Sequence, residues 1–129
     1  MITVTRVFSF CYGHYLPDYE GKCRNFHGHN SAVEVEVAGP TFGEYPGMVM
    51  DFSNIKKIVE PIIDQLDHKA LNEYLPFQKY CSSLSMSKCI PTGELICGYL
   101  VEKIKEKIPT IIRLRVSETP TSWAEWRKD

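Results

Sequence analysis

A strict alternation of apolar and polar residues most constrains what this chain can fold into. Between Val33 and Val37 every second residue is a valine, and glutamates fill the positions between them. The segments from Ile2 to Cys11 and from Ile112 to Ser117 repeat this pattern less strictly. Because strand side chains point alternately to the two faces of a sheet, all three segments predict antiparallel strands with one buried face.

The middle of the chain has a helical period instead. Between Ile55 and Leu66 the apolar residues recur every three or four positions, which predicts a helix with one buried stripe. We expect Ser53 to cap this helix and Pro61 to kink or split it. A second helix is expected to begin at Pro91-Thr92, because proline and a capping residue are typical of a helix start.

The remaining segments complete an α+β pattern. The polar stretch from Cys81 to Lys88 predicts a surface loop, and residues Thr121 to Trp126 predict a last strand. The order ββααββ indicates an antiparallel sheet with helices packed on one face. The 129 residues contain no internal repeat or long linker, so we expect one domain over residues 1–129.

Charge and hydropathy narrow the classes of function. Fifteen Lys and Arg against sixteen Asp and Glu give a net charge of −1, which predicts no general attraction to nucleic acid or to an anionic membrane. No segment approaches the ~20 apolar residues of a membrane helix, and the first residues lack the basic head of a secretion signal. The five cysteines are therefore expected to stay reduced, in the cytoplasm.

Three of the four histidines are spaced so that they can meet. His27 and His29 are two residues apart and point the same way in a strand, while His14 follows Phe8 and Phe10 on the apolar side of the first strand. If the two strands pair antiparallel, the three imidazoles converge. Three neutral imidazoles with an open fourth position are typical of catalytic zinc. The alternative is that these are unrelated histidines of a hairpin.

Cys23 precedes this histidine pair and has three alternative interpretations. It could be a fourth metal ligand, an inert loop thiol, or a base whose thiolate is favoured by the charges of Lys22 and Arg24. The other cysteines have no spacing that indicates a metal site, and Cys97 is expected to be packed within the second helix.

Two carboxylates, Asp67 and Glu118, are candidate active-site residues. Asp67 precedes His68 and could orient it as an acid–base pair, or the two could form a solvated helix end. Glu118 continues the apolar face of the strand that contains Val116, where a buried carboxylate needs partners such as ligand N–H groups. The alternative is that this strand ends before Glu118 and leaves it exposed.

Motifs along nearly the whole chain resemble one family. They are Phe8-Ser9-Phe10 leading to His14, Cys23-Arg24-Asn25-Phe26-His27-Gly28-His29, Met50-Asp51-Phe52, Leu66-Asp67-His68-Lys69-Ala70-Leu71-Asn72, Pro91-Thr92-Gly93-Glu94 and Ser117-Glu118-Thr119-Pro120. Together they resemble the 6-pyruvoyl-tetrahydropterin synthase and 6-carboxytetrahydropterin synthase family. The resemblance implies a tunnelling fold, assembled as a hexamer of two trimeric rings with sites between subunits.

The resemblance also implies roles for individual residues. His14, His27 and His29 would hold zinc, and Cys23 would be the proton-abstracting base. Asp67 and His68 would form a relay with it, and Glu118 and Thr92 would bind the pterin substrate. Gly93 and Leu95 depart from the Ala and Asn common in this family, which leaves the start of the second helix and the substrate fit open.

The short spacing between Cys23 and His27 resembles that of the bacterial carboxy-forming enzymes. The implied substrate is 7,8-dihydroneopterin triphosphate. The implied products are 6-carboxy-5,6,7,8-tetrahydropterin, acetaldehyde and triphosphate, on the way to 7-deazapurines such as queuosine. Two alternatives stay open: the pyruvoyl-forming elimination of triphosphate, and a non-catalytic zinc module in which Cys23 closes the metal shell.

Overall fold

The computed structural model describes residues 1–43 and 45–129 as a five-stranded sheet with helices. The strands lie in the order β3-β1-β2-β4-β5, and all pairs are antiparallel except the short parallel pair of β1 with β3. Their bounds are β1 Thr3–His14, β2 His27–Ala38, β3 Lys69–Ala70, β4 Ile111–Thr119 and β5 Ser122–Arg127. The α-helices are α1 Phe52–Asp64, α2 Leu75–Ser83 and α3 Gly93–Lys107, and Lys22–Arg24 and Leu71–Glu73 form short 3₁₀ turns.

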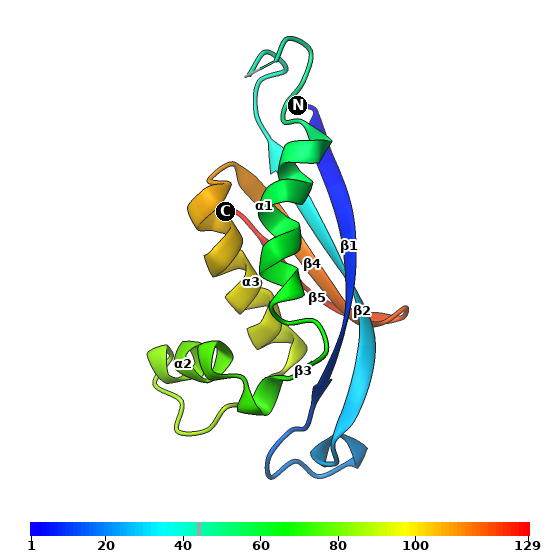
Figure 1. Ribbon diagram of the computed structural model, residues 1–129, viewed down its shortest axis with the longest axis vertical. Helices are drawn as coiled ribbons and strands as arrows, with labels where there is room; N and C mark the ends of the chain where they lie inside the picture. The colour runs from blue at the N-terminus through cyan, green and yellow to red at the C-terminus, as the bar shows by residue number, and fades with distance from the viewer. Residues whose placement is uncertain (44) are drawn as a thin grey trace.

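The helices α1 and α3 lie along the same face of the sheet, with α2 at one end (Figure 1). The core between the two layers contains the alternate residues of the central strands, including Val33, Val35, Leu114 and Val116, all fully buried. Opposite them lie Ile55 and Val59 of α1 and Ile96 and Leu100 of α3. The expected α+β architecture with helices on one face is confirmed.

The opposite face of the sheet carries charged side chains. Arg113 on β4 donates hydrogen bonds to Glu36 at 2.6 Å, to Glu125 at 3.0 Å and to Glu34 at 3.1 Å. These side chains are only about a fifth to a quarter exposed. The alternating glutamates of β2 therefore have a structural role, because they neutralise an arginine on the neighbouring strand.

Three local expectations need correction. Asp51, not Ser53, caps α1, because the Asp51 side chain accepts a hydrogen bond from the Ser53 amide at 2.8 Å. Pro61 does not split α1, which continues to Asp64 with the proline inside it, and the alternative that Pro61 kinks the helix stays a prediction. The segment Cys81–Lys88 is not all surface loop, because Cys81 is buried in the last turn of α2, a helix that the apolar period did not indicate.

None of the helices described within residues 1–43 and 45–129 has the length and apolar character needed to cross a membrane.

Candidate active site

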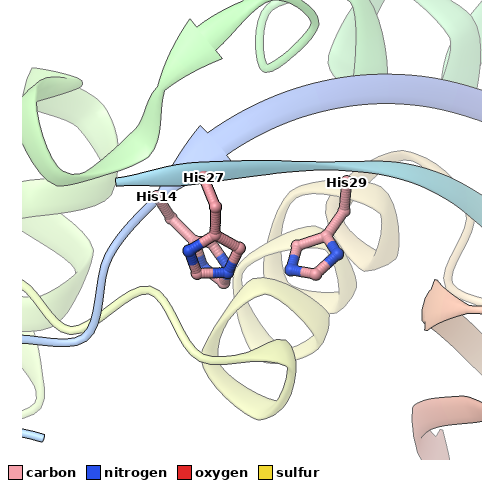
Figure 2. A group of neighbouring side chains, drawn as sticks. All are labelled: His14, His27 and His29. Atoms are coloured by element: carbon pink, nitrogen blue, oxygen red, sulfur yellow. The ribbon is translucent and has the colours of Figure 1, made fainter. Parts of the chain in front are cut away.

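The hairpin of β1 and β2 brings three histidines together at its open end. His14 is directly opposite His27 in the ladder, and Tyr12 is opposite His29. Figure 2 shows the three imidazoles projecting from the same side of the two strands. One ring nitrogen from each histidine can be chosen so that all three lie within 4.8 Å of one another. The predicted convergence of the three histidines is confirmed.

Hydrogen bonds orient two of these rings. The Nδ1 atom of His14 lies 2.6 Å from the carbonyl oxygen of Pro91, and Nδ1 of His27 lies 2.7 Å from that of Asn25. A carbonyl oxygen can only accept, so each neutral ring carries its proton on Nδ1 and directs the lone pair of Nε2 inward. Such outer partners are typical of metal-binding histidines.

The inward nitrogens then need a cation. The Nε2 atoms of His14 and His27 are 3.1 Å apart, and two lone pairs at this distance repel unless a proton or a metal ion lies between them. His29 Nε2 is buried and has no hydrogen-bond partner among the described residues. Burial lowers the pKa of His14, which favours the neutral ring that a metal requires. The three histidines therefore fit a metal ion with three imidazole ligands.

Glu118 lies on the same side of the sheet as the histidines. Strand β4 continues to Thr119, so the alternative that the strand ends before Glu118 is wrong. A Cβ atom on Gly93 would lie 3.7 Å from Glu118 Oε1, which places this carboxylate against the first residue of α3. Thr92 caps that helix by accepting a hydrogen bond from the Leu95 amide at 3.2 Å, so its hydroxyl hydrogen remains available to donate.

Tyr12 is a site residue that the sequence analysis did not single out. Its ring packs against His14 and His29, with centroid distances of 5.1 and 5.6 Å, and the residue is 3% exposed. Burial, and then the negative charge of Glu118, raise the pKa of Tyr12, so the phenol keeps its proton. The two-residue period from Tyr12 to His14 could have indicated this position.

Asp67 and His68 form a pair away from the histidine cluster. His68 Nδ1 lies 2.9 Å from Asp67 Oδ2, and the Asp67 carboxylate also accepts a hydrogen bond from the Cys11 amide at 2.8 Å. The Cys11 hydrogen bond, followed by that of His68, lowers the pKa of Asp67. The Cys11 hydrogen bond ties Asp67 to β1, next to the short edge strand β3.

The His68 side chain is 79% exposed and lines a hollow of about 550 Å³. Cys11 and Gly13, which also line it, alternate along β1 with Tyr12 and His14 and so belong to the opposite face of the sheet. Gly28 and Asn30 of β2 line the hollow from that opposite face as well, and Tyr12 and His29 also border it. Among the described residues, His68 does not belong to the three-histidine group of its own chain.

Cys23 lies in the 3₁₀ turn Lys22–Arg24 between β1 and β2, and it is partly exposed. Its carbonyl oxygen accepts a hydrogen bond from the Leu16 amide at 2.8 Å, which closes the loop. Among the described residues, the group that could hold a metal contains the three histidines and not this thiol.

Asn72 explains the last residue of the Leu66–Asn72 motif. The Asn72 side chain is buried, and its amide both donates to the Tyr15 carbonyl and accepts from the Tyr15 amide, each at 2.9 Å. These two hydrogen bonds to the backbone fix the chain immediately after His14. No sequence signal could have identified the carbonyl groups of Asn25 and Pro91, because any residue type supplies a carbonyl.

Fold and site together define the chain as an α+β protein with a three-histidine group capable of holding a metal at one end of its sheet. The model of the 6-pyruvoyl tetrahydropterin synthase family matches residues 3–129, and the chain belongs to this family. The fold is accordingly the tunnelling fold of that family.

Relatives of known name cover nearly the whole chain. It is 37% identical to 6-carboxy-5,6,7,8-tetrahydropterin synthase of Synechocystis, over 98% of this chain and 93% of the relative. It is 30% identical to the enzyme of the same name from Haemophilus influenzae, over 99% and 100% of the two chains. The solved structure of 6-pyruvoyl tetrahydropterin synthase from Caenorhabditis elegans superposes with a TM-score of 0.80 at 25% identity, covering 99% of this chain and 96% of the other.

Proposed function

We propose that this chain is a zinc-dependent lyase that converts 7,8-dihydroneopterin triphosphate to 6-carboxy-5,6,7,8-tetrahydropterin, acetaldehyde and triphosphate, a step towards 7-deazapurines such as queuosine. The observation that carries the proposal is the three-histidine group beside Glu118, in a chain that relatives named 6-carboxy-5,6,7,8-tetrahydropterin synthase match over 98–99% of its length.

Zinc suits this site because its donors are three neutral imidazoles. His14 and His27 are held by backbone carbonyls, and His29 Nε2 lacks any other partner among the described residues. When bound, the ion would supply Lewis-acid polarisation of the substrate's side-chain oxygens, which acidifies the neighbouring C–H groups. The protein's own side chains would transfer the protons and bind the pterin.

Proton transfer is assigned to Cys23 and His68, and Asp67 is assigned to orient His68. Cys23, as a thiolate, would remove a proton from a carbon of the substrate side chain. His68 would exchange a second proton through Nε2, because its Nδ1 is held by the Asp67 carboxylate at 2.9 Å. Asp67 fixes the tautomer of His68 and stabilises the ring when it is charged.

Glu118 and Thr92 would bind the pterin ring. A carboxylate accepts two parallel hydrogen bonds from the ring N–H and the exocyclic amino group, which matches one edge of a pterin. The Thr92 hydroxyl, whose oxygen already caps α3, would donate to a ring acceptor. Lys22 and Arg24 are exposed in the loop beside Cys23 and could neutralise the triphosphate.

We propose that each complete site forms between two copies of the chain, within a hexamer of two trimeric rings. The support is that His68 is outside the three-histidine group of its own chain and is 79% exposed, in a hollow lined mainly by residues of β1 and β2 that alternate with the histidines.

Mixing two inactive variants tests this arrangement. Cys23→Ala and His68→Ala should each be inactive, and random mixed oligomers should regain about a quarter of wild-type activity, one half times one half. Zero activity in verified mixed oligomers would place each site within a single chain.

The product identifies the reaction. Incubation with 7,8-dihydroneopterin triphosphate should release acetaldehyde in a 1:1 ratio with consumed substrate. Release of triphosphate without acetaldehyde would instead support the pyruvoyl-forming reaction. The similar C. elegans structure is named for that reaction.

Metal analysis separates the enzyme from a zinc-stabilised module. Replacing His27 by Ala should strongly lower bound zinc, whereas Cys23→Ala should leave it nearly unchanged, because the thiol is outside the three-histidine group. If Cys23→Ala loses as much zinc as His27→Ala, Cys23 is a ligand and its assignment as the base is wrong.

A further inference from the structure

Tyr12 occupies a position among the histidines that the proposed reaction does not yet use. It is paired with His29 across the β1–β2 ladder and precedes His14 by two residues, so all three side chains share one side of the sheet. Phe10, the preceding residue on that side, stacks on the Tyr12 ring with a centroid distance of 5.2 Å. The aromatic ring of Tyr12 is thus well explained by packing, and only its hydroxyl needs a reason.

That hydroxyl is buried without a partner. Among residues 1–43 and 45–129, three buried side-chain atoms lack a hydrogen-bond partner: Tyr12 Oη, His29 Nε2 and Arg115 Nε. The first two belong to directly paired residues at the candidate site. An orphaned hydroxyl is unfavourable, and phenylalanine would fill the same space without it. A group bound at the site would give this hydroxyl a partner, as a metal ion would give one to His29.

We infer that the Tyr12 hydroxyl donates a hydrogen bond to a side-chain oxygen of the bound pterin, and so selects pterins that carry a hydroxylated side chain. This inference rests on the proposed function. Tyr12 contacts His14 and His29, the metal-binding end of the site, where the substrate's side-chain oxygens are expected. The pterin ring itself is assigned to Glu118 and Thr92. Tyr12 is therefore a specificity-determining residue rather than an acid or a base.

The test compares two ligands on the zinc-loaded protein. The probes are 7,8-dihydroneopterin, which has the trihydroxypropyl side chain, and 7,8-dihydropterin, which lacks it. Tyr12→Phe should weaken dihydroneopterin binding about 3- to 10-fold, the usual range for one neutral hydrogen bond, and leave dihydropterin binding unchanged. Tyr99→Phe is the matched control, because Tyr99 is a buried tyrosine of α3 that packs against Phe77 and Tyr80; it should change neither affinity.

Two further readouts exclude a purely structural role. The melting temperature of the ligand-free Tyr12→Phe protein should be equal to or above that of the wild type, because an unpartnered hydroxyl has been removed, and its zinc content should be unchanged. A lower melting temperature with an equal loss of affinity for both ligands would mean that the hydroxyl is bonded within the protein, and would overturn the inference.

The outcomes also separate the inference from the proposed function. If wild-type protein binds dihydroneopterin and Tyr12→Phe binds it equally well, only the role of Tyr12 is wrong. If wild-type protein binds neither pterin, both the proposed function and the role of Tyr12 are wrong.

Discussion

Replacing Gly93 by alanine tests how α3 is joined to the candidate site. Gly93 is the first residue of α3, directly after the capping residue Thr92, and it is buried. A Cβ atom there would meet the Glu118 side chain at 3.7–3.8 Å, which is ordinary van der Waals contact. Alanine is favoured over glycine by up to about 1 kcal/mol inside a helix and by less in the first turn. We therefore expect Gly93→Ala to stabilise the protein by about 0.5–1 kcal/mol.

For a chain of 129 residues this corresponds to a rise of roughly 2–4 °C in melting temperature. The measurement is a thermal melt at fixed protein and zinc concentrations, because ligands that bind the native state shift the midpoint. Dihydropterin affinity is the second readout. It should stay within about threefold of wild type, since the added methyl lies beside Glu118 without displacing its carboxylate.

Gly98→Ala in the same helix is the control. There a Cβ atom would clash with the hydroxyl oxygen of Tyr80, whose ring is held between Phe77 and Tyr99. The gain in helix propensity should be offset by the shift of that ring, so no increase in melting temperature is expected. A drop of several degrees for Gly93→Ala, or an equal rise for both variants, would refute this account of the packing at Glu118.

Two further predictions concern other parts of the fold. Arg113→Met should destabilise the protein by about 1.5–3 kcal/mol at pH 7, because it removes charge-assisted bonds to Glu34 and Glu36. The Arg113 hydrogen bond lowers the pKa of Glu36 in the folded protein. The stabilisation from this bond is therefore present above the unfolded glutamate pKa of about 4.3 and is lost as the pH falls through the lower folded pKa. Urea melts should show that the difference in unfolding free energy between wild type and variant shrinks below about pH 4. Cys89 should alkylate slowly at pH 8, because burial and the neighbouring Cys81 thiol raise its pKa to about 12; rapid labelling of Cys89 in peptide maps would contradict this.

The meeting of the three histidines was predictable because it follows from local rules. Period-two alternation placed His14 on the apolar face of the first strand and placed His27 and His29 together on one face of the second strand. Antiparallel pairing of the two neighbouring strands then brings the three histidines together. Glu118 was predictable to the same degree, since it continues the period of β4. These inferences needed no knowledge of the loops.

What the sequence could not provide depends on contacts between distant segments. Helix α2 has a weak apolar pattern and is held by the burial of Phe77 and Cys81, which no local period indicates. The outer partners of the histidines are backbone carbonyls, which leave no trace in residue type. The missing partner of Tyr12 is likewise a property of its surroundings, and only the packed structure identifies it.

The register of β1 decides which groups can share a ligand. Because side chains alternate between faces, a slip of one residue would move His14 to the face of Cys11, away from His27 and Glu118. Three hydrogen-bonded contacts oppose such a slip: Asn72 binds the Tyr15 backbone, Asp67 binds the Cys11 amide, and the His68 amide donates to the Cys11 carbonyl at 2.6 Å. The segment that carries the proposed acid–base pair thus also holds the strand that carries a proposed metal ligand. A substitution at Asp67 should therefore disturb the histidine cluster as well as the relay, so metal content must be measured before any loss of activity is assigned to proton transfer.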